Sequence, residues 1–305
     1  MALRIMRLLV LTAAGLAISG LILLLAMRFH PATLGILLAA AGQRDTCGLP
    51  EAIAGIAKKS EVLESQPRIA GALRALRSDP NGLTLWETPH GKFWAPSDSG
   101  SVMPVLLAQQ QARIYGEVAA GEIVIDGGAH VGVYTRRAID AGAKLVVAVE
   151  PAPENVECLR RNFANEIGAG RVIVYPKGVW HRDDELVLHT VAGNSAGDSF
   201  VIKNGEGKGV RVPLTTIDKL TAELNLPRVD RIKLDIKGAE RQALRGAVEV
   251  LKRFRPKLAL AAEHHPDDYA QLPALVRNLR PESNIHCGIC FVRNYRVYPE
   301  TLLIE

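Results

Sequence analysis

Aromatic residues, cysteines and clustered charge are all scarce in this chain of 305 residues. Phe, Trp and Tyr make up 5% of it, and the basic residues behind its net charge of +5 are spread along the sequence. Nucleic-acid-binding proteins usually combine a basic cluster with stacking aromatic rings, so we expect no nucleic-acid partner. Internal repeats and low-complexity tracts are absent too, which favours an ordinary globular body.

The four cysteines are too few and too scattered for a disulfide framework, which favours a reducing compartment. Two of them form the motif Cys287-Gly288-Ile289-Cys290 directly after His286. A zinc site would need a second pair of ligands, and the sequence has no second CxxC motif. We therefore interpret this cysteine pair as structural.

A long hydrophobic run, Leu8–Ala26, contains 19 residues without a charge and lies between Arg7 and Arg28. At helical rise this length spans a membrane core, and no small-residue cleavage site follows it as in a signal peptide. We expect a transmembrane helix within an N-terminal membrane anchor, residues 1–42, with a cleaved signal peptide as the alternative. The flanking charges leave its orientation open.

The rest of the chain divides into a helical extension with a hairpin, residues 43–115, and a catalytic domain, residues 116–305. In the extension, Pro67 interrupts a helical spacing of apolar residues, which predicts two short helices. Two apolar runs on either side of a Thr-Pro-His-Gly turn, Leu83–Trp86 and Lys92–Ala95, predict the hairpin.

Short apolar strands alternate with helical stretches throughout the catalytic domain. This alternation predicts βαβ units, so the expected fold is α/β: a Rossmann-like, doubly wound, mostly parallel sheet that ends in a C-terminal antiparallel hairpin over 290–293 and 295–298. A single helix is expected over Ala239–Phe254. The expected strands are Ile123–Ile125, Leu145–Val149, Val172–Tyr175, Leu186–His189, Val210–Leu214, Arg231–Leu234 and Lys257–Ala262.

A glycine-rich loop, Asp126-Gly127-Gly128-Ala129-His130-Val131-Gly132, joins the first of these strands to a helix. Glycines there let the backbone approach a ligand at the helix N-terminus. The dinucleotide fingerprint GxGxxG fails because Ala129 stands at its second glycine position, which disfavours an NAD-dependent oxidoreductase. The acid Asp126 suits the ammonium of an amino-acid moiety and would repel a pyrophosphate.

A second acid, Glu150, ends the next strand, where a carboxylate accepts hydrogen bonds from the ribose hydroxyls of an adenosyl ligand. Together the loop and Glu150 predict that S-adenosylmethionine is the cofactor. Gly178, after the third strand, is expected to border the adenine. The expected cofactor-binding residues are Asp126, Gly128, Ala129, His130, Gly132, Glu150 and Gly178.

Several motifs resemble the FkbM-type methyltransferases, from about Leu83 to the C-terminus. Residues 124–135 look like that family's opening motif, Glu150-Pro151 is similar to its second motif, and 213–220 resemble the segment before its fourth strand. The stretch Arg231–Glu240 resembles its hallmark, with one departure: Lys237 stands where the family usually carries glutamate. The resemblance implies methyl transfer from S-adenosylmethionine to a hydroxyl of a sugar, lipid-linked glycan or similar metabolite.

Methyl transfer to a hydroxyl needs the nucleophile aligned behind the methyl carbon and a base that takes its proton. We expect Asp235, Glu240 and His265 to be the catalytic residues, with Asp235 the leading candidate. The run Glu263–Asp268 contains two histidines and acids, but adjacent residues of an extended chain point in opposite directions, so we assign no metal ligand.

Two hypotheses remain for the chain as a whole. The first is an O-methyltransferase that acts on a small-molecule or lipid-linked hydroxylated acceptor. The second, motivated by Lys237, is a membrane-anchored protein that binds S-adenosylmethionine or serves as a scaffold but has lost catalysis. Because S-adenosylmethionine is made in the cytosol, we expect a single-pass membrane protein whose catalytic domain is cytoplasmic.

Overall fold

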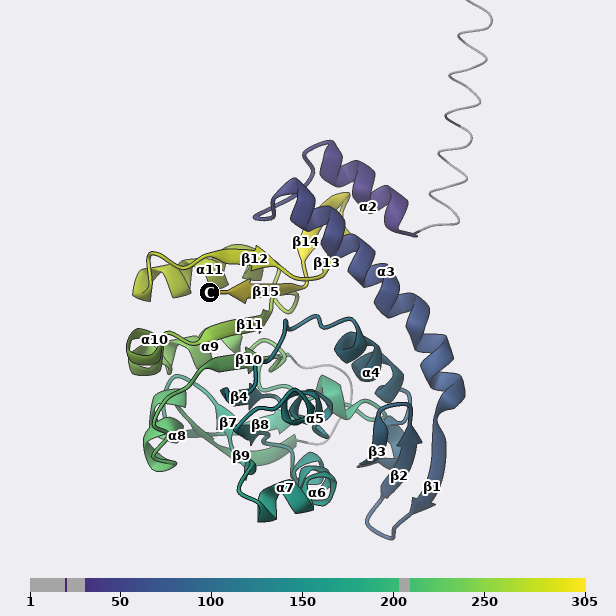
Figure 1. Cartoon of the computed structure of the whole chain (residues 1–305), viewed down its shortest axis with the longest axis vertical. Helices are drawn as coiled ribbons and strands as arrows, with labels where there is room; N and C mark the ends of the chain where they lie inside the picture. The colour runs from purple at the N-terminus through teal and green to yellow at the C-terminus, as the bar shows by residue number, and fades with distance from the viewer. Residues whose placement is uncertain (1–19, 21–30, 203–208) are drawn as a thin grey trace, which may run out of the picture.

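The computed structural model describes residues 20, 31–202 and 209–305 (Figure 1). Apart from Gly20, the predicted transmembrane segment Leu8–Ala26 lies outside these residues. Among the described residues, no helix is both long enough and apolar enough to cross a membrane. This finding contradicts the predicted single-pass membrane localisation and its cytoplasmic catalytic domain, and we withdraw both.

A seven-stranded sheet forms the centre of the molecule, in the order β12-β15-β11-β10-β4-β5-β6. Five neighbouring strands are parallel, and β15 runs antiparallel to both β11 and β12. The parallel strands are rich in buried apolar residues, as expected where helices cover both faces of a sheet, with Asp126, Arg231, Lys233 and Lys257 as the charged exceptions. The strands are β4 (Ile123–Gly127), β5 (Leu145–Val149), β6 (Val172–Tyr175), β10 (Arg231–Leu234), β11 (Lys257–Ala261), β12 (Ile285–Cys287) and β15 (Thr301–Ile304).

Helices cover both faces of this sheet, and alternate strand residues enter two separate cores. Val146 faces α4 (Met103–Gln111), α5 (Val133–Asp140) and α6 (Pro153–Asn162), whereas its neighbour Val147 faces the other side. The prediction of a parallel-rich α/β sheet is confirmed. The helices of the second face are α8 (Ile217–Glu223), α9 (Glu240–Arg245), α10 (Val248–Phe254) and α11 (Asp268–Leu279), so the single helix expected over 239–254 is in fact two.

The N-terminal extension wraps one side of the domain, as Figure 1 shows, and differs from its prediction. Its long helix α3 (Leu49–Ala72) continues through Pro67, because Val62 and Ile69 on either side are buried in the core, and tertiary packing outweighs the lost hydrogen bond. The remaining elements are α2 (Pro31–Ala40), β1 (Arg74–Ser78), β2 (Leu83–Thr88), β3 (Gly91–Pro96) and the short turn η1 (Ser97–Ser99).

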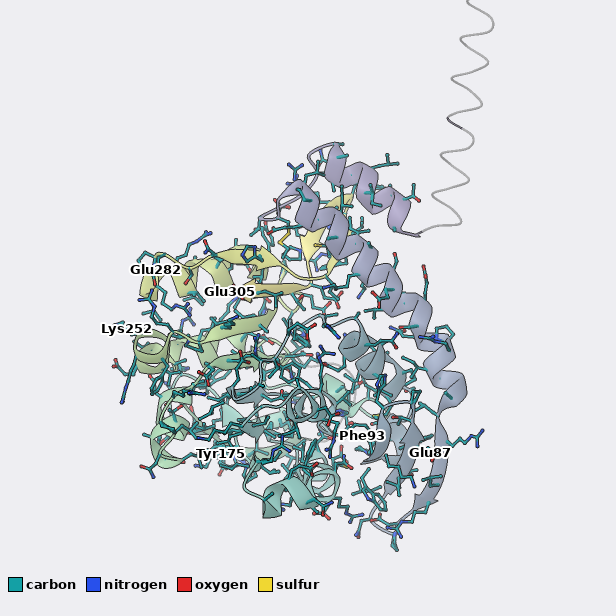
Figure 2. All side chains as sticks on the ribbon, viewed as in Figure 1. Glu87, Phe93, Tyr175, Lys252, Glu282 and Glu305 are labelled. Atoms are coloured by element: carbon teal, nitrogen blue, oxygen red, sulfur yellow. A yellow bond between two sulfur atoms is a disulfide. The ribbon has the colours of Figure 1, made fainter. Side chains whose placement is uncertain are left out.

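The predicted hairpin of β2 and β3 is present, with β1 as an added third strand. Figure 2 shows Phe93 on its inner side and Glu87 on its outer side. Phe93 is buried and Glu87 is exposed, the alternation of a strand with one covered face. The hairpin thus rests on the same core as α4.

Other short elements complete the chain. The predicted C-terminal hairpin forms a small sheet of its own, and the central sheet is closed instead by β12 and β15, which were not predicted. Three strands that come between α7 and α8 along the chain form another sheet, in the order β7-β9-β8. These elements are α7 (Ala164–Gly168), β7 (Gly178–Val179), β8 (Asp184–His189), η2 (Ser195–Gly197), β9 (Gly209–Thr215), β13 (Cys290–Arg293) and β14 (Arg296–Pro299).

The cysteines also depart from the prediction. Cys47 and Cys287, 240 positions apart, form a disulfide that ties the start of α3 to β12. Cys158 and Cys290 are buried free thiols, so the CxxC motif does not act as a pair. The inference of a reducing compartment loses its basis, because spacing along the chain gives no sign of two cysteines that only the fold brings together.

Candidate functional site

A cavity of about 570 Å³ lies at the carboxyl ends of the parallel strands. The chain leaves β4 toward β5 on one side and leaves β10 toward β11 on the other, so the loops after these two neighbouring strands diverge. Such a switch point is where open α/β sheets bind ligands. Loops after β4, β5, β10 and β11 all line the cavity, together with one side of α4 and the two residues before it.

Glycine is required twice in the loop after β4. Gly128 has a φ of 73°, and a Cβ there would lie 2.1 Å from the carbonyl oxygen of Asp235. Gly132, with a φ of 92°, begins α5, and a Cβ there would lie 2.2 Å from the ring of Phe163. The glycine spacing therefore serves close packing of the loop against β10 and α6.

Asp126 lies beneath this loop and does not line the cavity. It is fully buried, forms an ion pair with Lys233 at 3.0 Å and accepts a hydrogen bond from the Thr135 hydroxyl at 2.7 Å. The Lys233 ammonium also donates to the carbonyl of Gly128 at 2.9 Å. The structure thus places Asp126, like Gly132, as a support of the loop, whereas Gly128, Ala129 and His130 face the cavity.

Glu150, which follows β5, lines the cavity. Its carboxylate accepts hydrogen bonds from the backbone N–H groups of His130 (2.8 Å) and Ala152 (3.0 Å) and from the Asn155 amide (3.4 Å). Burial raises its pKa, and these donors oppose the rise. A carboxylate accepts about four hydrogen bonds, so Glu150 keeps capacity for a ligand hydroxyl.

His130 stands on the same wall with a φ of 53°. Its Nε2 lies 2.7 Å from the hydroxyl of Ser195 in η2, an element that borders the cavity from the other side. Burial, with smaller contributions from Lys233 and Lys237, lowers the pKa of His130 to about 3. The imidazole is therefore uncharged at neutral pH and acts through hydrogen bonds.

Asp235 follows β10 and lines the cavity, and both of its carboxylate oxygens have partners. Oδ1 lies 2.5 Å from the Lys237 ammonium, and Oδ2 accepts a hydrogen bond from the Tyr115 hydroxyl at 2.9 Å. Burial alone would raise the pKa of Asp235, but Lys237, Lys233 and His264 hold it well below its usual range. Asp235 in turn raises the pKa of Lys237 against the effect of burial.

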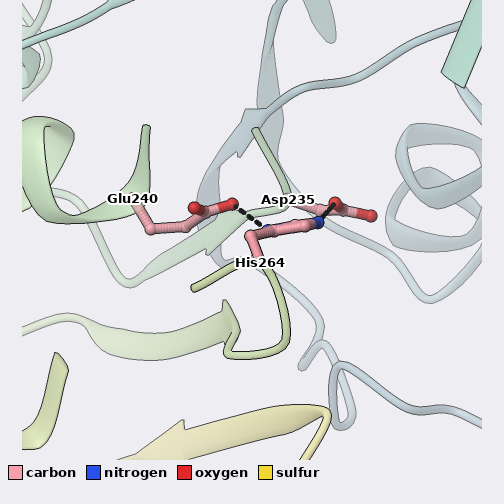
Figure 3. Close-up of side chains that lie close together, drawn as sticks. All are labelled: Asp235, Glu240 and His264. Carbon is pink, nitrogen blue, oxygen red and sulfur yellow. Dashed lines mark hydrogen bonds and ion pairs between the residues drawn. The ribbon is translucent and has the colours of Figure 1, made fainter. Parts of the chain in front are cut away.

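His264 lies between Glu240 and Asp235, as Figure 3 shows. The Glu240 carboxylate is fully buried and lies 3.0 Å from His264 Nδ1, while His264 Nε2 lies 3.7 Å from Asp235. Glu240 also accepts hydrogen bonds from the backbone N–H groups of Ile236 (2.8 Å) and Gly238 (3.0 Å). It therefore holds the loop that carries Lys237.

His265 does not hydrogen-bond to Asp235 or Glu240 through its side chain. Its Nε2 lies 3.0 Å from the carbonyl oxygen of Gly238, and its backbone N–H donates to Asp268 at 2.7 Å. Of the three predicted catalytic residues, only Asp235 lines the cavity. His264, which was not among the predicted residues, is the histidine beside Asp235.

Two further residues near Asp235 and the glycine-rich loop were not predicted from the sequence. Tyr115 reaches Asp235 from a loop 120 positions earlier, and no local pattern announces it. Lys233 was quoted only as part of a motif, although a lysine inside a buried strand implies a buried acid as partner. That rule identifies Asp126, which lies opposite Lys233 in the register of β4 and β10.

Asp235, Glu240 and His264 offer ligand atoms that all lie within 4.8 Å of one another, a set that suits a divalent ion. The Lys237 ammonium, however, lies 2.5 Å from Asp235 and 3.4 Å from His264 Nε2. A cationic group of the chain already contacts two of the three ligands. The cluster is thus a poor fit for an added cation, and we assign no metal ligand within it.

Known proteins resemble this chain at several levels. The profile of the methyltransferase FkbM domain matches residues 126–283, in agreement with the motifs of the sequence. No curated protein matches the chain. Among solved structures, the methyltransferase FkbM from Methylobacillus flagellatus KT aligns with a TM-score of 0.46 and 18% identity, over 82% of this chain and 60% of that one.

Two other solved methyltransferases are similar at low identity. Trm5b from Pyrococcus abyssi aligns with a TM-score of 0.39 and 16% identity, over 77% of this chain and 56% of that one. Precorrin-6y C5,15-methyltransferase from Geobacter metallireducens GS-15 aligns with a TM-score of 0.35 and 13% identity, over 67% and 86%. The chain thus spans less than two thirds of the first two structures.

Proposed function

Because this chain belongs to the FkbM methyltransferase family, which residues 126–283 match, we propose that it transfers the methyl group of S-adenosylmethionine to a hydroxyl of a sugar, lipid-linked glycan or similar metabolite. The observation that carries the proposal is the cavity at the switch point of the sheet. Glu150 lines it from the loop after β5, and Asp235 lines it from the loop after β10. A reaction between two bound molecules needs one group of residues to hold the cofactor and another to hold the acceptor, both in the same cavity.

Five predicted residues would hold the cofactor: Gly128, Ala129, His130, Glu150 and Gly178, which all line the cavity and which we call the cofactor end. Glu150 has capacity to accept from a ribose hydroxyl, and His130 adds no positive charge near a sulfonium. When bound, the cofactor supplies an electrophilic methyl group. Asp126 and Gly132 contribute through the loop that they support.

Three charged residues line the cavity from the loops after β10 and β11, and we call them the acceptor end: Asp235, Lys237 and Glu263. Asp235 is held by Lys237 and Tyr115, so its orientation is fixed before an acceptor arrives. A fixed carboxylate of this kind positions a hydroxyl for in-line attack. Glu240 supports the loop after β10 as a positioning residue.

The alternative is a protein that binds S-adenosylmethionine but no longer catalyses transfer. It is favoured by the engagement of both Asp235 oxygens, which leaves that carboxylate a weak base. Radioactive methyl transfer by the full chain to a panel of free monosaccharides and alkyl glycosides separates the two proposals. Transfer to any hydroxyl rejects the alternative.

Calorimetry of the full chain with S-adenosylmethionine and with NAD tests the cofactor. We expect binding of the first alone, and expect Glu150→Ala to weaken it by about 1 to 3 kcal/mol, the effect of losing a hydrogen-bond partner that carries a charge. Glu154→Ala, at an exposed position in the first turn of α6, is the matched control. Because Glu150 also holds two backbone N–H groups, Glu150→Gln and a denaturation curve accompany the measurement. Unchanged affinity in folded Glu150→Ala would refute the ribose role.

A further inference from the structure

Four carboxylates line the cavity, and they differ in how far the protein already satisfies them. Glu150 accepts three hydrogen bonds, and both oxygens of Asp235 have partners. Asp198 accepts from the backbone N–H of Val191 at 2.8 Å, and its other oxygen is enclosed by protein. Glu150 and Asp235 therefore already have partners. Burial also raises the pKa of Asp198 to about 7, but its unpartnered oxygen is closed off from solvent, and Asp198 comes from the segment after η2 rather than from the loops after β10 and β11 that form the acceptor end.

Glu263, the fourth, follows directly after β11 and is the exception. Its side chain is exposed to solvent and lines the cavity, yet it forms no hydrogen bond or ion pair with any other residue of the described chain. The charged groups that act on it most are Lys237 and Asp235 from the loop after β10, His264 beside it, and Glu300 from the turn before β15. Because β11 is the neighbour of β10 in the sheet and both loops line the cavity, Glu263 lies at the same end of the cavity as Asp235.

We propose that Glu263 is the catalytic residue that takes the proton from the acceptor hydroxyl, a step that rests on the function proposed above. The acceptor oxygen forms a bond to the methyl carbon while the carbon–sulfur bond breaks. The electron pair of that bond stays on sulfur, which turns the sulfonium into the thioether of S-adenosylhomocysteine. The hydroxyl proton passes to the Glu263 carboxylate, and because this side chain is solvent-exposed, the proton then leaves to water.

The surroundings of Glu263 suit this task. Partial desolvation by the surrounding protein raises the pKa of Glu263 to about 7, although its side chain keeps contact with solvent; Glu300 and Asp235 add to the rise, and Lys237 and His264 oppose it. A general base works best when its pKa lies near the working pH. Asp235, by contrast, is held so far below its usual range by Lys237 that it orients the hydroxyl but accepts no proton.

The test compares Glu263→Gln with the full wild-type chain, using labelled S-adenosylmethionine and the panel of monosaccharides and alkyl glycosides. We expect kcat to fall by about 10²- to 10⁴-fold with unchanged cofactor affinity, as for the removal of a general base. Wild-type kcat should rise with pH to a plateau, with a midpoint near 7, and the residual rate of Glu263→Gln should lack that rise. Glu249→Gln, in the first turn of α10 and outside the cavity, is the control.

A second measurement needs no acceptor. In the wild-type chain labelled with ¹³C at glutamate carboxyl carbons, the signal missing from the Glu263→Gln spectrum should titrate near pH 7. Titration below pH 5, or full kcat in folded Glu263→Gln, overturns the role of Glu263. Loss of cofactor binding in Glu263→Gln alone would also overturn it, whereas absence of cofactor binding in the wild type overturns the proposed function itself.

Discussion

The two ends of the cavity are built in different ways. At the cofactor end, position is set by the backbone: Gly128 lies against β10 without room for a side chain, and Glu150 is held by two main-chain N–H groups. At the acceptor end, position is set by side chains, chiefly the contacts of Asp235 with Lys237 and Tyr115. A backbone-built wall tolerates little change in sequence, whereas a wall of ion pairs changes its chemistry with one substitution.

The largest effect should follow from breaking the backbone wall. Gly128→Ala places a Cβ 2.1 Å from the carbonyl oxygen of Asp235 in a left-handed conformation. Overpacking and the φ penalty together should cost about 3 to 5 kcal/mol in the free energy of unfolding, measured by urea denaturation. Gly71→Ala, at a helical position with nothing within 4 Å of the added Cβ, is the control and should not destabilise the protein. A loss below about 1 kcal/mol in Gly128→Ala would show that the loop can move away.

The side-chain wall should respond less in stability and more in pH dependence. Lys237→Ala removes the cation beside Asp235 and should cost about 2 kcal/mol at pH 7. Because the pKa of Asp235 is lowered in the folded protein, its stabilising contribution is present above the unfolded pKa of about 3.9 and is lost as the pH falls below it. The variant should therefore lose less stability than the wild type between pH 5 and pH 2, by comparison of urea midpoints.

Lys219→Ala provides the matched control for this effect. Lys219 pairs with the exposed Asp183 on the surface, where an ion pair contributes little because solvent screens it. If Lys237→Ala and Lys219→Ala show the same acid sensitivity, the pair at the acceptor end does not govern the ionisation of Asp235.

The same contrast explains what could be predicted from the sequence. The parallel sheet and the loop from Asp126 to Gly132 were predictable, because hydrophobic strands and glycine spacing are local signals. Glu150 was found for the same reason, as an acid at a strand end. The partners of Asp235 were not predictable in full, because Tyr115 and His264 come from distant segments and only the folded chain brings them together.

Distance in sequence also hid features outside the cavity. The disulfide between Cys47 and Cys287 joins segments with no pattern in common, and β12 and β15, which close the central sheet, were not predicted. At Pro67 the local signal was wrong: a proline predicts a helix break, but packing along α3 outweighs it and the helix continues. Of the seven cofactor-binding residues predicted from local rules, five line the cavity, whereas of the three predicted catalytic residues only Asp235 does.

The smallest expected effect concerns His130 at the cofactor end, which forms a backbone hydrogen bond to Glu150 and a side-chain hydrogen bond to Ser195. The folded pKa of about 3 lies below the unfolded value near 6.5, so the unfolded chain binds a proton first as the pH falls. Wild-type stability should accordingly decline by about 1 to 2 kcal/mol between pH 7 and pH 5 because of this residue. His130→Asn should remove that decline and keep the fold, since asparagine tolerates the φ of 53°. His90→Asn, an exposed turn residue, serves as control, and an equal pH slope in all three proteins would mean that His130 is not buried as an uncharged ring.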